Sequence, residues 1–101
     1  MTTWFVSRHP GAHEWLQSQG VRVDRRVEHL DTSLVEPGDT VCGSLPVHLV
    51  AQLCAQGARY IHLIVDLPPQ ARGRELTAEE MRAYGARLVC FDVREVPCHS
   101  G

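Results

Sequence analysis

Hydrophobic and polar positions alternate along this chain in two patterns. Short apolar runs occur at residues 3–6, 21–23, 40–43, 60–65 and 88–93, and stretches whose apolar residues recur every three or four positions separate most of them. The first pattern predicts strands and the second predicts helices. Because strands and helices follow one another in turn, we expect an α/β fold with a mostly parallel five-stranded sheet flanked by about three helices.

The predicted strands differ in polarity. Residues 60–65 are almost continuously apolar, as expected for a central parallel strand with helices on both faces. His62 lies inside this run and is expected to be a hydrogen-bonded core histidine. The strand at residues 21–23 is more polar, since it contains or adjoins Arg22, Asp24, Arg25 and Arg26, and we place it at an edge of the sheet.

Two of the predicted helices have clear ends. The first covers residues 10–19, with Pro10 in its opening turn. The last begins at a capping box formed by Thr77 and Glu80 and ends at Gly85, a residue that adopts the left-handed conformation readily.

The helix between these two begins near Ser44 and Pro46 and ends at Gly57. Four of its residues are spaced at i, i+3, i+4 and i+7, which places them on one side of a helix. They are Val47, Val50, Ala51 and Cys54. We expect this stripe to face the sheet.

The composition adds limits on size and on ligands. With 101 residues, of which 44% are hydrophobic, the chain fits one domain over residues 1–101 with a small core, and a homodimer would add to its stability. Its net charge of −2 argues against a protein that coats long DNA or RNA, because such proteins need broad positive surfaces. A small anionic ligand held by a few arginines remains compatible with this charge.

The cysteines favour a reducing environment. Cys42, Cys54, Cys90 and Cys98 show no CxxC spacing, and Cys98 with His99 lacks the regular ligand spacing of a zinc site. No signal peptide or membrane-length apolar run is present. We therefore expect a cytoplasmic protein that needs no metal or cofactor and does not bind membranes.

Three loops that follow predicted strands are candidates for a ligand site. In an open α/β sheet, ligands bind beyond the carboxyl ends of the parallel strands, so residues 7–11, 43–48 and 66–76 are expected to meet at one electropositive rim.

The first loop carries the strongest candidates. It joins a strand to a helix start, where free backbone N–H groups favour an anion. Arg8 is expected to bind a phosphate or, alternatively, to pair with Glu14. His9 can move a proton near neutral pH, and Ser7 can either bind the ligand or cap the helix.

The second loop contains Gly43 and Ser44, which would let a second helix start approach an anion, and His48, which is either at the rim or an ordinary surface histidine. The full phosphate loop GxxxxGK[ST] and the GxGxxG pattern are both absent, which argues against nucleoside triphosphates and dinucleotides as ligands.

In the third loop, Arg72 and Arg74 could clamp separate phosphates. Their alternative partners are Glu75 and Glu79 on the surface, and Asp66 could hold one of the two arginines in place.

Taken together, these segments resemble a family of small CRISPR-associated proteins that accompany type III systems. The likeness spans residues 3–93 and is carried by residues 4–11 (WFVSRHPG), 43–48 (GSLPVH), 66–69 (DLPP) and 72–76 (RGREL). Membership in that family implies a Rossmann-like (CARF-like) fold and a ring nuclease that destroys cyclic oligoadenylate, with cyclic tetra-adenylate as the expected ring.

The resemblance implies a mechanism without a metal, because the ribose 2′-hydroxyl is the nucleophile. Arg8 and one of the third-loop arginines would stabilise the phosphate, His9 or His48 would move the proton, and Ser7 would orient the ring. Linear products ending in a 2′,3′-cyclic phosphate are expected.

Two alternatives stay open at this point. The same loops could form a sensor or sponge that holds the ring without cutting it. A metal-dependent phosphoesterase built on His9, His48 and Asp66 is the other.

Overall fold

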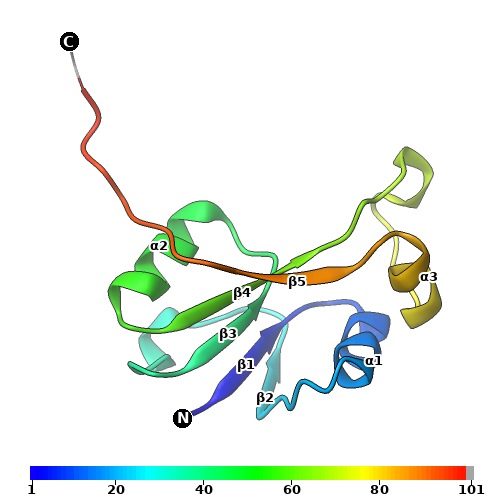
Figure 1. The fold of residues 1–101 in the computed structure, drawn as a ribbon, viewed down its shortest axis with the longest axis horizontal. Coiled ribbons are helices and arrows are strands. Elements are labelled where there is room, and N and C mark those ends of the chain that lie inside the picture. The colour runs from blue at the N-terminus through cyan, green and yellow to red at the C-terminus, as the bar shows by residue number, and fades with distance from the viewer. Residues whose placement is uncertain (100–101) are drawn as a thin grey trace.

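Five strands form one sheet in the order β2-β1-β3-β4-β5 (Figure 1). The computed structural model describes residues 1–99. Its strands are β1 (Thr3–Val6), β2 (Arg25–Val27), β3 (Thr40–Gly43), β4 (Arg59–Ile64) and β5 (Arg87–Phe91). Its α-helices are α1 (Pro10–Ser18), α2 (Val47–Ala55) and α3 (Ala78–Ala83), and two single 3₁₀ turns cover Thr32–Leu34 (η1) and Pro69–Ala71 (η2). The expected α/β fold with a mostly parallel sheet is confirmed.

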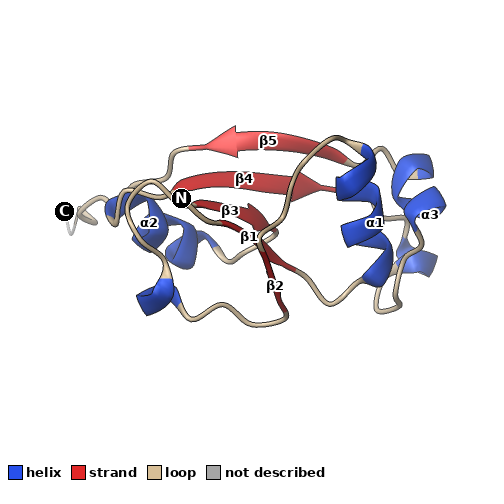
Figure 2. Cartoon of the chain, turned by 90° about the horizontal axis from the view of Figure 1, so that it is seen from below, coloured by secondary structure: helices blue, strands red, loops and turns tan. Residues whose placement is uncertain are grey.

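The direction of β5 decides where the longest connection lies. β1 pairs in parallel with β2 and β3, and β3 pairs in parallel with β4, whereas β4 and β5 are antiparallel. Because an antiparallel pair is joined at one end of the sheet, the whole connection of residues 65–86, with η2 and α3, lies beyond the carboxyl end of β4. Figure 2 shows α3 there, beside α1.

Helices cover both faces of the sheet. Neighbouring strand residues point to opposite faces, and Phe5 belongs to one buried cluster while Trp4 belongs to another. Phe5 packs with Trp15 of α1 and Met81 of α3. Trp4 packs in the second cluster, to which α2 contributes Val50 and Leu53.

The second strand lies four residues later than predicted. Its pairing with β1 places Arg25 beside Trp4, and the Arg25 guanidinium carbon lies 5.4 Å from the centre of the indole ring. Val21 and Val23, which suggested the strand, instead pack at the margin of the Phe5 cluster as part of the connection. The strand is at an edge of the sheet, as expected.

Only part of the predicted stripe of α2 faces the sheet, since Val50 and Cys54 pack in the Trp4 cluster. Val50 and Leu53 are buried against it, whereas Val47 is 69% exposed. Ala51 and Cys54 are half-buried. The buried side is therefore rotated from the one predicted, because a helix that is apolar on most sides gives no periodic signal for the buried side.

The end signals of α3 are confirmed. The Thr77 hydroxyl accepts a hydrogen bond from the backbone N–H of Glu80 (3.1 Å), and the Glu80 carboxylate accepts one from the N–H of Thr77 (3.2 Å). Leu76 and Met81 flank this box and are both buried in the Phe5 cluster. A six-residue helix is thus fixed by its cap and by burial.

Two further observations concern the cysteines and the helices. All four cysteines are free, and burial raises the pKa of the Cys42 thiol to about 12. Among residues 1–99, no helix combines the length and the apolar character that crossing a bilayer requires.

Asp39 joins the start of the chain to the turn before β3. Its carboxylate accepts hydrogen bonds from the backbone N–H of Thr2 (2.9 Å) and of Glu36 (3.0 Å) and from the indole N–H of Trp4 (3.2 Å). These bonds, those from Glu36 and Thr2 above all, lower the pKa of this carboxyl below its ordinary value of 3.8. Asp39 is 4% exposed, and the ionised form is the one that the fold stabilises.

We predict that Asp39→Asn lowers the free energy of unfolding at neutral pH by about 1–3 kcal/mol, because an amide NH₂ group would face backbone donors. Since the folded-state pKa is depressed, the carboxylate stabilises the fold above pH 3.8 and this contribution is lost as the pH falls through the folded value. Urea unfolding followed from about pH 7 to about pH 2.5, more than one pH unit below the ordinary pKa of an aspartate, would measure this loss of stability. A difference between wild type and variant that does not shrink in acid would contradict this role.

Candidate functional site

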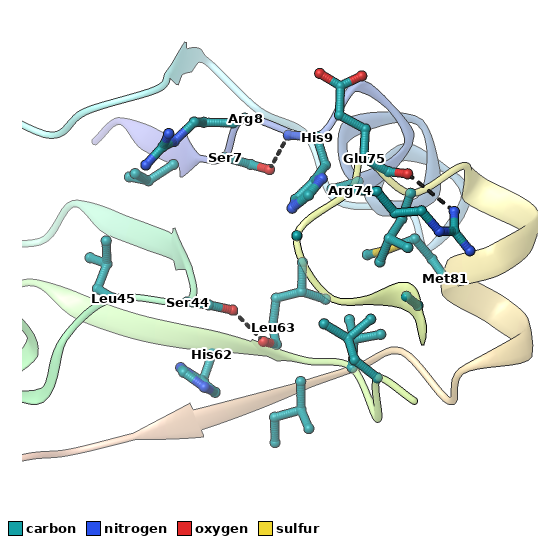
Figure 3. Close-up of a pocket in the computed structure, with 18 of the residues that line it drawn as sticks. Ser7, Arg8, His9, Ser44, Leu45, His62, Leu63, Arg74, Glu75 and Met81 are labelled. Carbon is teal, nitrogen blue, oxygen red and sulfur yellow. Dashed lines mark hydrogen bonds between the residues drawn. The ribbon is translucent and has the colours of Figure 1, made fainter. Parts of the chain in front are cut away.

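A cleft of about 830 Å³ lies at the carboxyl ends of the parallel strands, within the range of roughly 300–1,000 Å³ usual for ligand sites. In the sheet, β2 lies on one side of β1, whereas β3 and β4 lie on the other side. The strand order therefore changes direction between β1 and β3, and the cleft sits at this topological switch point. Figure 3 shows its walls. The polar residues that line it are Ser7, Arg8, His9, Glu28, Ser44, His62, Arg74 and Glu75.

The loop after β1 forms one wall. The Ser7 hydroxyl oxygen accepts a hydrogen bond from the backbone N–H of His9 (3.0 Å), which leaves the Ser7 proton free to donate to a ligand. No side chain caps α1, whose N-cap is His9. The His9 ring points into the cleft (Figure 3), and its Nδ1 is buried without a hydrogen-bond partner among the described residues.

The loop after β3 forms the opposite wall and is tied to the sheet. The Ser44 hydroxyl donates to the backbone carbonyl of Leu63 (2.5 Å). The Tyr60 hydroxyl accepts from the N–H of Leu45 (3.0 Å) and lies 3.0 Å from the carbonyl oxygen of Gly43 and 2.6 Å from Nδ1 of His62. Burial raises the pKa of this phenol, so it stays protonated and holds the loop in place.

The loop after β4 contributes Arg74, whose guanidinium is engaged by α3. It forms an ion pair with the Glu80 carboxylate (2.5 Å) and approaches the Tyr84 hydroxyl (3.4 Å). The hydrogen bond from Arg74, together with that from the Thr77 backbone, lowers the pKa of Glu80 to about 2. The carboxylate partner of Arg74 is thus Glu80, and neither the Glu75 nor the Glu79 carboxylate takes that place. The Glu75 backbone carbonyl accepts a hydrogen bond from Arg74 (3.4 Å).

Four predicted site residues lie outside the cleft lining. Gly43 is buried at the end of β3, where a Cβ atom would be 2.8 Å from the carbonyl oxygen of Val6, so its small size serves strand packing. His48 is exposed and lines a separate groove beside α2. Asp66 pairs with Arg87 (3.0 Å), so the prediction that it holds a loop arginine is wrong. Arg72 is exposed.

Three polar lining residues were not predicted as site residues: Glu28, His62 and Glu75. Glu75 was expected only as a surface partner of the loop arginines. Glu28 directly follows β2, and the rule that ligands bind beyond strand ends would have found it if that strand had been placed correctly. His62 is hydrogen-bonded as expected, with Tyr60 as its partner, but it is half-buried and lines the cleft instead of lying in the core.

The charge of the cleft corrects the expected electropositive rim. Arg8 and Arg74 are balanced by Glu28 and Glu75 among the residues that line it. Figure 3 shows Arg8 and Arg74 on opposite sides, with the Glu75 carboxylate directed away from His9 and Ser44. Positive charge is therefore local to each side, and its two sources are well separated across the opening.

The close approach of α1 to the third loop brings these walls together. A Cβ atom at Gly11 would lie 2.2 Å from the carbonyl oxygen of Leu76 and 2.6 Å from the carbonyl carbon of Thr77. These are backbone atoms just before α3, so only glycine fits. The contact fixes the end of residues 66–76 against the first turn of α1, next to His9.

Metal ligands do not gather in the described part of the chain. No group of three or more His, Cys, Asp or Glu side chains there is arranged to hold an ion. In particular, His9, His48 and Asp66 are not brought together, since they lie in the cleft, in the groove beside α2, and in an ion pair with Arg87, respectively.

The fold is that of a small α/β protein with a cleft at the switch point of its sheet. Residues 4–94 match the family model described as "Putative CRISPR-associated protein (Cas_VVA1548)". The chain therefore belongs to this family of CRISPR-associated proteins. No curated protein and no solved structure matches it.

We predict that Gly11→Ala lowers the free energy of unfolding by about 1–3 kcal/mol or more, because the methyl group overlaps backbone that has no alternative rotamer. Chemical denaturation measures this effect. The matched control is Gln17→Ala on the exposed side of α1, for which we expect a change within about 0.5 kcal/mol. Equal stability of Gly11→Ala and wild type would show that the two backbones are not held this close.

Proposed function

We propose that this protein is a ring nuclease that binds cyclic oligoadenylate, with cyclic tetra-adenylate as the ring, and cuts it without a metal. The observation that carries the proposal is the convergence of Ser7, Arg8 and His9 with Ser44 and Arg74 in one cleft. The products would be linear, and the activity would switch off type III CRISPR signalling.

Two further lines support the proposal. Membership in a CRISPR-associated family agrees with the resemblance carried by residues 4–11, 43–48 and 66–76. The strand order 2-1-3-4 followed by one antiparallel strand is compatible with a Rossmann-like, CARF-like fold.

Arg8 and Ser7 are placed to bind a phosphodiester of the ring. The guanidinium of Arg8 supplies two donors for non-bridging oxygens, and the free proton of the Ser7 hydroxyl supplies another. Charge on those oxygens grows as the phosphorus becomes five-coordinate, so these donors stabilise the transition state more than the bound ring.

His9 takes the proton from the ribose 2′-hydroxyl in this scheme. The 2′-oxygen then forms a bond to the adjacent phosphorus, and the bond from phosphorus to the 5′-oxygen breaks. The 5′-oxygen takes a proton from water, and the hydroxide that this leaves takes the proton back from His9. The product ends in a 2′,3′-cyclic phosphate and a 5′-hydroxyl. His9 is favoured over His48 because its ring points into the cleft, whereas His48 lines a different groove.

A homodimer completes the proposal. A ring of four nucleotides repeats the same phosphate and base around its centre, so two copies of one cleft related by a two-fold axis could hold opposite halves.

Arg8→Ala is expected to lower turnover of cyclic tetra-adenylate in EDTA by roughly 10²–10³-fold, the usual effect of removing a donor to a developing oxyanion. Its melting temperature should stay near that of wild type, because Arg8 is exposed and outside the core. Arg82→Ala, at an exposed arginine on α3 outside the cleft, is the matched control and should retain activity.

The same assay separates cutting from storage. Linear products at many turnovers per chain support the nuclease, whereas a tight complex with the intact ring would make the protein a sponge or sensor. A ring that stays both intact and unbound would exclude both functions.

Glu80→Gln should tighten binding of the ring several-fold. Glutamine at this position still serves the capping box, but the neutral amide no longer holds Arg74 by charge, so the guanidinium is free to turn to a ligand phosphate. Calorimetry with the Arg8→Ala/Glu80→Gln double variant would measure it without cleavage. Unchanged affinity relative to Arg8→Ala alone would remove Arg74 from the ligand contacts.

A further inference from the structure

His62 has one ring nitrogen bonded within the protein and the other free. Its Nδ1 lies 2.6 Å from the hydroxyl oxygen of Tyr60. Its Nε2 forms no hydrogen bond among residues 1–99 and is not one of the buried polar atoms that lack a partner, so it is open to solvent. Because His62 lines the cleft, a bound ligand can reach Nε2.

The contacts of the Tyr60 hydroxyl decide which nitrogen of His62 carries the proton. A hydroxyl group has one proton and two lone pairs. The N–H of Leu45 can only donate, so it occupies one lone pair (3.0 Å), and the carbonyl oxygen of Gly43 can only accept, so it takes the hydroxyl proton (3.0 Å). The remaining lone pair faces Nδ1 of His62, and this contact is a hydrogen bond only when Nδ1 carries a proton.

This pattern makes Nε2 of His62 a hydrogen-bond acceptor. Burial raises the pKa of the Tyr60 phenol, so the hydroxyl keeps the proton that it donates to Gly43. A neutral imidazole has one N–H group and one lone pair, and with the proton on Nδ1 the lone pair is on Nε2. His62 therefore offers an acceptor to a ligand, whereas Arg8 and the Ser7 hydroxyl offer donors.

The direction of Nε2 is fixed before any ligand binds. The His62 ring packs edge-to-face with Phe91, with 5.7 Å between the ring centres and 81° between the ring planes. Its backbone lies in β4, where it is paired with Gly43 of β3 on one side and with Val89 of β5 on the other. A ring that is already held at Nδ1, against Phe91 and through its backbone loses little freedom when a ligand binds.

The position of His62 selects the part of the ligand that it meets. Figure 3 shows its ring on the far side of Ser44 from Arg8 and Arg74. Phosphate oxygens bind at the arginines and have no proton to donate to Nε2. In cyclic oligoadenylate the donors are the ribose hydroxyls, which adjoin the phosphates, and the N6 amino groups, which lie at the end of adenine remote from the sugar. The amino group is therefore the donor that can extend to His62.

We propose that His62 recognises adenine by accepting a hydrogen bond at Nε2 from the N6 amino group, with Tyr60 as the positioning residue that holds the acceptor tautomer. The inference rests on the proposed function and adds to it the selection of the base. A purine that lacks the amino group leaves Nε2 desolvated and without a partner, which lowers the affinity.

The tautomer is measured in the free protein, without any nucleotide. Long-range proton–nitrogen correlation spectra at mildly alkaline pH, where imidazoles are neutral, distinguish the protonated ring nitrogen from the unprotonated one by chemical shift. We expect Nδ1 of His62 to carry the proton. His48, whose ring forms no hydrogen bond among the described residues, is the reference for an unconstrained histidine. A His62 ring with its proton on Nε2 overturns the inference, whether or not the protein cuts cyclic tetra-adenylate.

Calorimetry tests the contact with the base. The Arg8→Ala background keeps the ligand intact. The ligands are cyclic tetra-adenylate and the matching cyclic tetranucleotide of purine riboside, in which hydrogen replaces each amino group. We expect cyclic tetra-adenylate to bind at least about 5-fold more tightly, which is the effect of leaving one buried acceptor without a partner. Equal affinity for the two ligands overturns the inference.

Two substitutions of His62 separate its bond to Tyr60 from its contact with the ligand. His62→Asn places an amide N–H near the position of Nδ1, so the bond to Tyr60 is kept while no atom remains at Nε2, and the preference for the amino group should be lost. His62→Gln can place its amide oxygen near the position of Nε2 and should restore part of the preference. His48→Asn, the same change in the groove beside α2, is the control and should keep the full preference.

The outcomes distinguish this inference from the proposed function. A preference for the amino group that survives His62→Asn overturns the role of His62 alone. Wild type that neither binds nor cuts cyclic tetra-adenylate overturns the proposed function and the contact with adenine together. Cleavage by wild type, with equal affinity of the Arg8→Ala variant for both ligands, leaves the nuclease standing and removes only the selection of the base by His62.

Discussion

The site depends on one close contact between backbones. Gly11, in the first turn of α1, lies against the carbonyl of Leu76 at a distance that leaves no room for a side chain. Residues 66–76 contain one short 3₁₀ turn and no strand, so few internal hydrogen bonds hold them. Their end is fixed because α3 is capped by Thr77 directly after this contact and because Leu76 is buried in the Phe5 cluster. The contact thereby holds Arg74 and Glu75 at the cleft and joins a long loop to the helix start that carries His9.

Arginines on opposite sides of the cleft are in different states. Arg8 forms no ion pair among residues 1–99, whereas Arg74 is held by Glu80, which also caps α3. The ion pair with Glu80 must break before Arg74 can bind a ligand phosphate. The side chains of Arg74 and Glu80 are 47% and 27% exposed, so hydration would offset much of the free energy lost with the pair. Glu28 and Glu75 also line the cleft, and their negative charges offset those of the two arginines. An anion therefore binds more favourably next to one of the guanidinium groups than in the middle of the cleft.

Patterns that depend on neighbours in sequence predicted most of the fold, whereas contacts between distant segments decided the rest. The run at β4 and the cap of α3 are local signals, and both are confirmed. The shift of β2 arises from pairing with β1 and from Arg25 over Trp4, which no local pattern contains. Of the site, the gathering of Ser7, Arg8, His9, Ser44 and Arg74 followed from the strand-end rule, but the pairing of Arg74 with Glu80 and of Asp66 with Arg87 depends on where α3 and β5 lie.

The two walls of the cleft are held with different rigidity. The wall at Ser44 is bonded to the sheet from both sides, through the Leu63 carbonyl and through the Tyr60 hydroxyl, which also orients His62. Bonds to strand backbone move only if the sheet moves. The wall at Arg74 is held by an exposed ion pair and by the Gly11 contact at its end. Adjustment to a bulky anion would therefore occur in residues 66–76, and the wall next to α2 would stay fixed.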